Sequence, residues 1–205
     1  MKLYYFPIAP NPTKVRVYLA EKGIQVDEVV VDFRQQEQRS EQHLARNPLG
    51  KLPVLELDDG SHLTESLVIM ELFEELHPEP PMIGGDPYER ARVRRLERIA
   101  DLGVLLPVGR IIHATKSPLG YPPNPEVAAA ERKALPNALA VLNDDLSDRP
   151  FVAGDQPTIA DCTLFSAFTF AQFGDVEIDV QFANLHEWFG RFRERPSAER
   201  ITAPI

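Results

Sequence analysis

The chain has a single cysteine, Cys162, and this scarcity excludes several kinds of chemistry. One cysteine cannot form an internal disulfide framework, a paired-thiol redox motif or a zinc site with several thiolates. Cys162 lies in the run ADCTLFSAF, where a small buried side chain is expected rather than a reactive nucleophile. The chemistry of the protein must therefore rest on other residues.

Long apolar runs and an excess of basic residues are also missing. No stretch approaches eighteen consecutive apolar residues, so no membrane span is expected. The start, MKLYYFPIAPNP, lacks a charged segment followed by an apolar segment and a cleavage site, which favours a cytoplasmic protein. With 22 Lys and Arg against 31 Asp and Glu, the net charge of -9 disfavours nucleic acid or an anionic membrane as a general partner.

Familiar catalytic motifs are absent as well. The sequence contains no GxxxxGKS/T, HExxH or GxSxG motif, and its five histidines are scattered. Without these motifs, the sequence predicts neither a nucleotide-binding site nor a metal site. What the chain does have is 205 residues, 43% of them hydrophobic, which suits one or two compact domains.

The first half of the chain alternates between strand and helix patterns. Residues 2–6 and 26–33 are predicted to be strands. The helix between them is expected to begin with Asn11 as its N-cap and to end near Gly23. The turn DDG at 58–60, between two apolar segments, predicts a hairpin.

A further helix is predicted after the hairpin, opened by Glu65 and Ser66. Its buried face is expected to carry Leu67, Met70, Phe73 and Leu76. The order βαβ followed by ββα is typical of a small mixed-sheet domain. Residues 77–87, HPEPPMIGGDP, concentrate proline and glycine and are predicted to be a linker.

Everything after the linker has helical spacing. A helix from Tyr88 is expected to kink at Pro107, and further helices are predicted over 125–147 and 184–195. The tetrapeptide TIAD at 158–161 has the form of a capping box, and the run after it is apolar almost all round. This pattern predicts a helix at the buried centre of its domain.

Several of these features together resemble one protein family. The stretch NPLGKLPVLELDDG with TES after it, the proline-rich linker, the all-helical second half and FVAGDQPTIADCT are similar to the cytosolic glutathione S-transferases. The resemblance implies an α/β N-terminal thioredoxin-like domain over 1–78, a linker over 79–87 and an all-α C-terminal domain over 88–205. It also implies a homodimer that uses glutathione as co-substrate, without a metal, and conjugates it to small hydrophobic electrophiles.

The same resemblance implies which residues bind glutathione. Pro53 would follow a cis peptide, so that the Leu52 backbone faces outward and pairs with the extended tripeptide. Lys51 would approach the glycine carboxylate, Glu65 would bind the γ-glutamyl ammonium, and Ser66 with its helix N-terminus would bind the γ-glutamyl carboxylate. Taken singly, these residues also fit an edge proline, a charge that complements the helix dipole and a plain cap.

The group that activates the thiol is not settled by the sequence. Family members usually place a Tyr, Ser or Cys just after the first strand, but FPIAPNPTKVR has Ala9 at the usual Ser position. This departure resembles a fungal and bacterial branch in which a Ser and a His on the first helix of the second domain position a water. It also resembles the nu class, where an Asn in this turn contacts the thiol, here Asn11. A helix-cap role for Asn11 fits the same pattern.

The stretch LPVGRIIHAT, residues 106–115, matches this helix of the second domain. His113 occupies the position of the branch's His, whereas Gly109 occupies the position of its Ser. A water held by His113 and the Gly109 backbone, or positive potential from Arg110, would assist the thiol. A purely structural histidine is the alternative. Tyr5 is a further hydroxyl, but it lies too early for the Tyr position of the family. The hydrophobic substrate pocket is predicted to be lined by Ile8, Pro10, Leu106, Arg110 and His113.

The sequence is compatible with two other functions. A glutathione-dependent disulfide reductase or peroxidase would use the same site and produce oxidised glutathione rather than a thioether. A non-catalytic binding module would explain Ala9 and Gly109 as decay of a catalytic site. Against this second alternative, Lys51, Pro53 and Glu65 keep the glutathione-binding pattern, for which a scaffold has no physical need.

Overall fold

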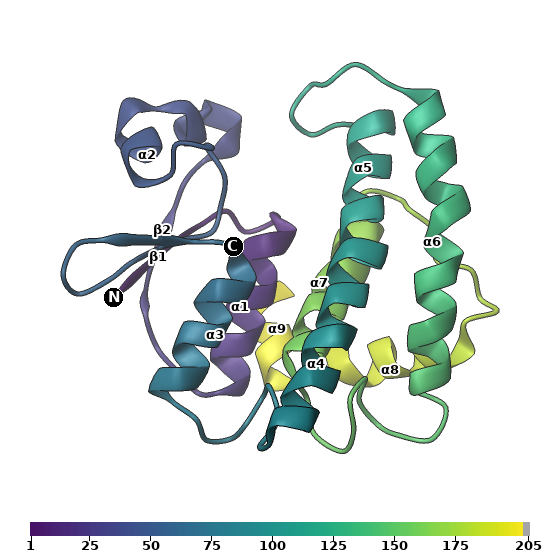
Figure 1. Cartoon of the computed structure of the whole chain (residues 1–205). Helices are drawn as coiled ribbons and strands as arrows, with labels where there is room; N and C mark the ends of the chain where they lie inside the picture. Colours follow the sequence, from purple (N-terminus) through teal and green to yellow (C-terminus); the bar gives the residue numbers. More distant parts are fainter. Residues whose placement is uncertain (203–205) are drawn as a thin grey trace.

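The computed structural model describes the backbone of residues 1–202 and shows two domains packed together (Figure 1). The first domain has a four-stranded sheet in the order β2-β1-β3-β4, with β1 at Lys2–Tyr5, β2 at Asp27–Val30, β3 at Val54–Glu56 and β4 at His62–Thr64. Strands β1 and β2 are parallel, whereas β3 is antiparallel to both of its neighbours. The βαβ and ββα order of a thioredoxin-like domain is therefore confirmed.

Helices cover both faces of this sheet (Figure 1). Helices α1 (Pro10–Glu21) and α3 (Ser66–Leu76) lie on one face, and α2 (Glu41–Arg46) lies on the other. Two short 3-10 turns, at Phe33–Gln35 and Glu37–Arg39, precede α2 and were not predicted from the sequence. They bring the connection after β2 round to the edge of the domain that faces the second domain.

The second domain is all-helical over the described residues. The kink predicted at Pro107 is present as a distortion of the helix in the turn before this proline. There the chain forms a π-helical turn, η3 (Asp101–Leu105), which ends directly before the α5 segment that holds Pro107. Proline lacks the N–H that would bond the carbonyl four residues back, which loosens the preceding turn. Within residues 1–202, no helix is long and apolar enough to cross a membrane. The helices are α4 (Pro87–Ala100), α5 (Leu106–Thr115), α6 (Pro125–Asp145), α7 (Ile159–Phe173), α8 (Ala183–Arg193) and α9 (Pro196–Thr202).

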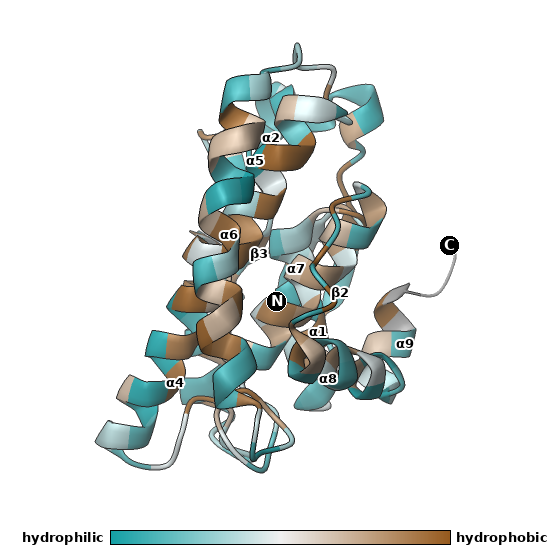
Figure 2. Ribbon diagram, turned by 90° about the vertical axis from the view of Figure 1, so that its right-hand side faces the viewer, coloured by the Kyte–Doolittle hydropathy of each residue, from teal (hydrophilic) through white to brown (hydrophobic). Residues whose placement is uncertain are grey.

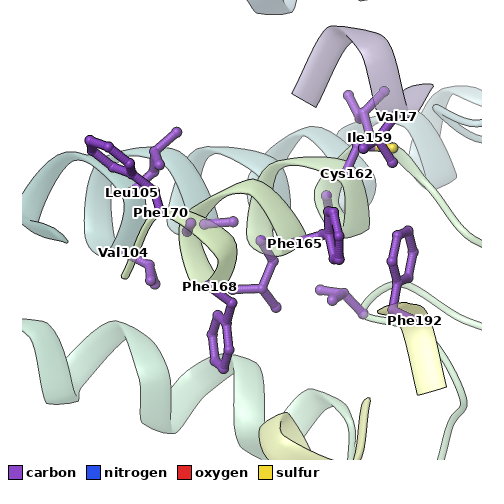
Figure 3. Packing of buried hydrophobic residues seen from close by; sticks show 14 of the residues in the cluster. Val17, Val104, Leu105, Ile159, Cys162, Phe165, Phe168, Phe170 and Phe192 are labelled. Atoms are coloured by element: carbon purple, nitrogen blue, oxygen red, sulfur yellow. The ribbon is translucent and has the colours of Figure 1, made fainter. Parts of the chain in front are cut away.

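Helix α7 is the centre of the second domain, as its apolar sequence predicts. Hydrophobic and hydrophilic residues alternate along α4 and α6, which each bury one side (Figure 2). Helix α7 instead buries almost every residue, with Phe165 and Phe168 pointing to different neighbours (Figure 3). Cys162 is fully buried in this helix, and burial raises the pKa of its thiol. The prediction of a structural cysteine is confirmed.

The capping box that opens α7 is confirmed and is part of a larger buried network. The two Asp161 carboxylate oxygens accept hydrogen bonds from the Thr158 N–H and hydroxyl, the Val152 N–H and the Trp188 indole N–H, at 2.9–3.0 Å. Burial raises the pKa of Asp161 to about 6, against the opposite effect of these donors. The Asp161 side chain thus joins the start of α7 to the turn that precedes α7 and to helix α8.

Two local predictions for the first domain are wrong. Helix α1 begins at Pro10 with Ala9 as its N-cap, so Asn11 lies inside the first turn and does not cap the helix. Proline suits this first position because its φ is preset and its missing N–H would have no helical partner. On α3, Leu76 is exposed, and Glu74 is buried instead because Tyr18 and other donors bond its carboxylate.

A buried ion pair joins the two domains. Lys14 of α1 has only 1% of its side chain exposed, and its ammonium lies 2.8 Å from Asp101 and 3.8 Å from Glu97. Arg98 bonds both of these carboxylates, and the Thr163 hydroxyl donates to Glu97. Burial acts to raise the pKa of Asp101, but the attraction of Lys14 and Arg98 prevails and lowers it.

The first prediction concerns the capping network. We expect Asp161→Ala to reduce the free energy of unfolding by about 3 kcal/mol, because it removes a helix cap and leaves buried N–H groups without an acceptor. Urea denaturation followed by circular dichroism measures this loss. Asp155→Ala, at an exposed position in the preceding turn, is the matched control and should change stability by less than about 0.5 kcal/mol. Equal losses in the two variants would contradict the assignment.

The second prediction concerns the interdomain ion pair. Lys14→Met keeps the unbranched apolar part of the side chain but removes the ammonium and leaves buried carboxylates undercompensated, so we expect a loss of about 3 kcal/mol in the free energy of unfolding at neutral pH. Adding Asp101→Asn should recover part of this loss, because the unpaired charge is then removed as well. Urea denaturation compares Lys14→Met, Asp101→Asn and the double variant with the parent. Simple additivity of the two single losses would show that the pair is not coupled.

Candidate functional site

A cleft of about 510 Å³ lies between the two domains and collects most of the predicted site residues. The first domain lines it with the β1–α1 turn, the 3-10 region before α2, the loop before β3 and the start of α3. The second domain lines it with η3, α5, the loop after α5 and one residue of α7. Among the predicted residues, the lining includes Pro10, Asn11, Lys51, Leu52, Glu65, Ser66, Leu106, Arg110 and His113.

The loop before β3 is held rigidly at the edge of the cleft. The Lys51 carbonyl accepts a hydrogen bond from the Asn47 amide at 3.0 Å and lies 3.2 Å from His43 Nε2, which must donate to it. His43 is buried, and burial lowers the pKa of its imidazole, so the neutral ring fits this place. The peptide between Leu52 and Pro53 is cis, as the family resemblance implies. Within residues 1–202, the Leu52 backbone has no hydrogen-bond partner.

The starts of α3 and α1 lie side by side on the first domain's wall of the cleft. Glu65, the N-cap of α3, has φ of 68° and ψ of 113°, an uncommon conformation for a residue with a side chain. It turns the chain sharply, and the next residue, Ser66, donates a 3.4 Å hydrogen bond to the Asn11 side chain. Two helix N-termini therefore open on the same space, which favours an anionic group there.

The opposite wall carries a histidine with a serine partner. His113 Nδ1 lies 2.9 Å from the Ser117 hydroxyl, and the His113 ring lies 5.4 Å from the Tyr121 ring. Burial lowers the pKa of His113. From the sequence we expected His113 to hold a water together with the Gly109 backbone, and a serine partner for this histidine was not predicted. The structure places one at Ser117, one turn after His113 and just beyond the end of α5. The signal available in the sequence was the Ser-Pro pair at 117–118, typical of a chain leaving a helix.

The two arginines with which the second domain lines the cleft, Arg98 and Arg110, are already paired with carboxylates. Arg110 bonds Glu131 of α6 at 2.7 Å, so the suggestion that it supplies free positive potential to a thiol is weakened. Arg98 and Asp101 also line the cleft and were missed by the sequence analysis, because their approach depends on packing against α1. Within residues 1–202, no group of three His, Cys, Asp or Glu side chains is arranged to hold a metal ion.

Three of the predicted residues lie outside the cleft lining. Ile8 is exposed and does not line the cleft, in contrast to the prediction that it lines the substrate pocket. Pro53 is buried and does not line the cleft, whereas Leu52 before it does. Tyr5 is buried in the sheet, and the Arg16 guanidinium lies 4.2 Å from the centre of its ring. This placement agrees with the expectation that Tyr5 lies too early in the chain to activate the thiol. The lining residues missed by the sequence include Gln38, Arg39, Leu102, Leu119, Tyr121 and Phe170.

Comparison with known proteins agrees with this architecture. Residues 3–81 match the family model for the glutathione S-transferase N-terminal domain, and residues 125–191 match that for the C-terminal domain. Glutathione S-transferase 2 of Saccharomyces cerevisiae is 30% identical over 207 residues, covering 98% of this chain and 89% of that protein.

Solved structures show the same likeness along the whole chain. The crystal structure of Gtt2 from Saccharomyces cerevisiae has a TM-score of 0.90 at 31% identity, covering 98% of this chain and 100% of that one. A glutathione S-transferase of Methylobacillus flagellatus with glutathione bound has a TM-score of 0.86 at 29% identity, covering 100% and 99%.

The fold and cleft define a two-domain protein that joins a thioredoxin-like half to an all-helical half. The chain belongs to the cytosolic glutathione S-transferase superfamily and is similar to its Gtt2-like fungal and bacterial members.

The third prediction concerns His113. Because burial disfavours the imidazolium, we expect its pKa to lie below the usual value of about 6.5, so that the ring is neutral at pH 7. Imidazole resonances followed by NMR as the pH is lowered measure this value. Tyr121→Ala exposes the ring to water and should raise the pKa toward its usual value. A parent pKa at or above 6.5 would contradict the expected effect of burial.

Proposed function

We propose that this chain is a glutathione transferase that binds reduced glutathione in the cleft, stabilises its thiolate and conjugates it to a small hydrophobic electrophile. The observation that carries the proposal is the difference between the two walls. The wall from the first domain presents Lys51, polar side chains and two helix N-termini. The other wall presents the exposed Leu102 and Leu106 beside arginines whose charges are already paired. A polar peptide and an apolar acceptor would thus meet in one cleft.

In this proposal, glutathione lies extended along the wall of the first domain. The unbonded Leu52 backbone would pair with the cysteinyl residue in the manner of an added strand. The γ-glutamyl carboxylate would bind the N–H groups at the start of α3 and the Ser66 hydroxyl, while Glu65 would bind the ammonium. Lys51, with Arg39 near it on the cleft wall, would bind the glycine carboxylate at the other end.

The thiol of glutathione needs help to ionise, because the pKa of a free thiol is about 8.5. The N-terminus of α1 favours negative charge in front of Asn11, which lowers the thiol pKa. His113, neutral and held through Nδ1 by Ser117, would accept the thiol proton at Nε2, directly or through one water. The thiolate sulfur then attacks the electrophilic carbon, and His113 returns its proton to solvent.

A disulfide reductase that uses a protein thiol is disfavoured by the position of Cys162. Its thiol is fully buried with a raised pKa, so it is not available for exchange with glutathione. The cytoplasmic location and the homodimer stay part of the proposal. A scaffold that binds glutathione without activating it is distinguished from a transferase by the thiol pKa.

The fourth prediction tests this function. Titration of glutathione by calorimetry should show binding, and the ultraviolet absorbance of the bound thiolate should give a pKa below about 8.5. His113→Ala or Asn11→Ala should raise that pKa, and whichever does so identifies the activating group. His186→Ala is the control, because His186 is exposed and bonds the Asp179 carbonyl outside the cleft.

The outcomes of this experiment distinguish a transferase from a scaffold and from a reductase or peroxidase. Binding with an unshifted thiol pKa, and without a thioether product from 1-chloro-2,4-dinitrobenzene, would replace the transferase by a glutathione-binding scaffold. Oxidised glutathione formed in place of a thioether would favour the reductase or peroxidase. Failure to bind glutathione would reject the assignment of Lys51, Glu65 and Ser66.

A further inference from the structure

Two glycines lie inside regular helices, where glycine is among the least favourable residues. Gly109 is in α5 and Gly190 is in α8, and neither has a positive φ that would require glycine. Gly103 differs from both, since a Cβ there would lie 2.5 Å from the Ala138 Cβ and would push η3 away from α6. Packing therefore explains Gly103, but not the other two.

Gly109 has room for a side chain on the protein side. A Cβ at this position would find Phe170 Cε1 at 3.8 Å, an ordinary van der Waals distance, and nothing nearer. Neither the backbone nor the packing of the folded protein accounts for glycine here. What sets Gly109 apart from Gly190 is that it lines the cleft. Its missing side chain leaves an open slot in the cleft wall.

Flat and apolar groups surround this slot. Leu106 lies three residues before Gly109 and His113 four residues after it, so both project from the same face of α5. The edge of the Phe170 ring forms the floor, and Tyr121 of the following loop reaches the His113 ring from outside. Three rings from three different segments thus border the space, together with the half-exposed side chain of Leu106.

We propose that Gly109 is a specificity-determining position, whose missing side chain admits the ring of an aromatic electrophile between Leu106 and His113. The inference rests on the proposed transferase function and specifies its acceptor. A planar ring fits a slot that is one side chain deep and gains stacking contacts with aromatic neighbours. For a halogenated nitroarene, the thiolate sulfur forms a bond to the ring carbon, the carbon–halogen bond breaks, and the halide leaves with the electron pair.

The fifth prediction uses the same substitution at both glycines. Gly109→Ala and Gly190→Ala each replace a helical glycine that has space for a methyl group, so both should raise the thermal midpoint. Calorimetry then measures the affinity of three ligands: glutathione, S-methylglutathione and S-(2,4-dinitrophenyl)glutathione. The aryl conjugate should bind the parent more tightly than the methyl conjugate does. Gly109→Ala should weaken only the aryl conjugate, by about tenfold, as expected for one methyl group in an apolar pocket.

The controls separate this inference from the proposed function. Gly190→Ala should leave all three affinities unchanged, because it is outside the cleft. If Gly109→Ala binds the aryl conjugate as well as the parent does, or if the parent does not prefer the aryl conjugate, the slot is rejected while the glutathione site stands. If the parent binds none of the three ligands, the proposed function itself fails.

Discussion

The geometry of the cleft depends on one constraint, which is that helix α1 is shared between the two domains. It packs against α3 on the sheet side and against α7 and α9 on the other. Polar contacts fix it at its start, middle and end, through the pairs Ser166–Pro10 (2.6 Å), Lys14–Asp101 (2.8 Å) and Arg195–Glu21 (2.6 Å). Because the first turn of α1 also lines the cleft, the packing that joins the domains sets the separation of its two walls.

Elements with a local signal were predictable from the sequence. The DDG turn located the hairpin, and the capping box located the start of α7, since in both cases the decisive residues are a few positions apart. Helix α1 shows the limit of this reasoning. Lys14 has the pattern of a surface residue, and its burial is made tolerable by carboxylates of the second domain, above all Asp101, 87 residues further on. Likewise, Ala9 replaced Asn11 as the N-cap because Pro10 fits the first helical position.

In the candidate site, too, one part was predictable from the sequence and another part was not. Lys51, Glu65 and Ser66 come from one contiguous stretch whose order carries the family resemblance, and the structure brings them to one wall. The facing wall is assembled from separate helices and a loop, so its members have no common pattern in the sequence. Ser117 illustrates this, because its role depends on where the chain leaves α5 and not on helical spacing from His113. The positive φ of Glu65 is likewise set by the turn into α3 and has no composition signal.

The proposed function places an acidic tripeptide on an acidic protein, so the attraction between them would have to be local. The net charge of -9 opposes an anionic ligand at long range, but physiological salt screens exposed charges beyond about 8 Å. Attraction must then come from groups inside the cleft. Arg98 and Arg110 add little, because carboxylates of the second domain already neutralise them. The N–H groups at the starts of α1 and α3 carry no net charge and need no counterion. In the proposed function, recognition would therefore depend on these backbone groups together with Lys51 and Arg39 on the wall of the first domain, so that the acidic surface is compatible with an acidic ligand.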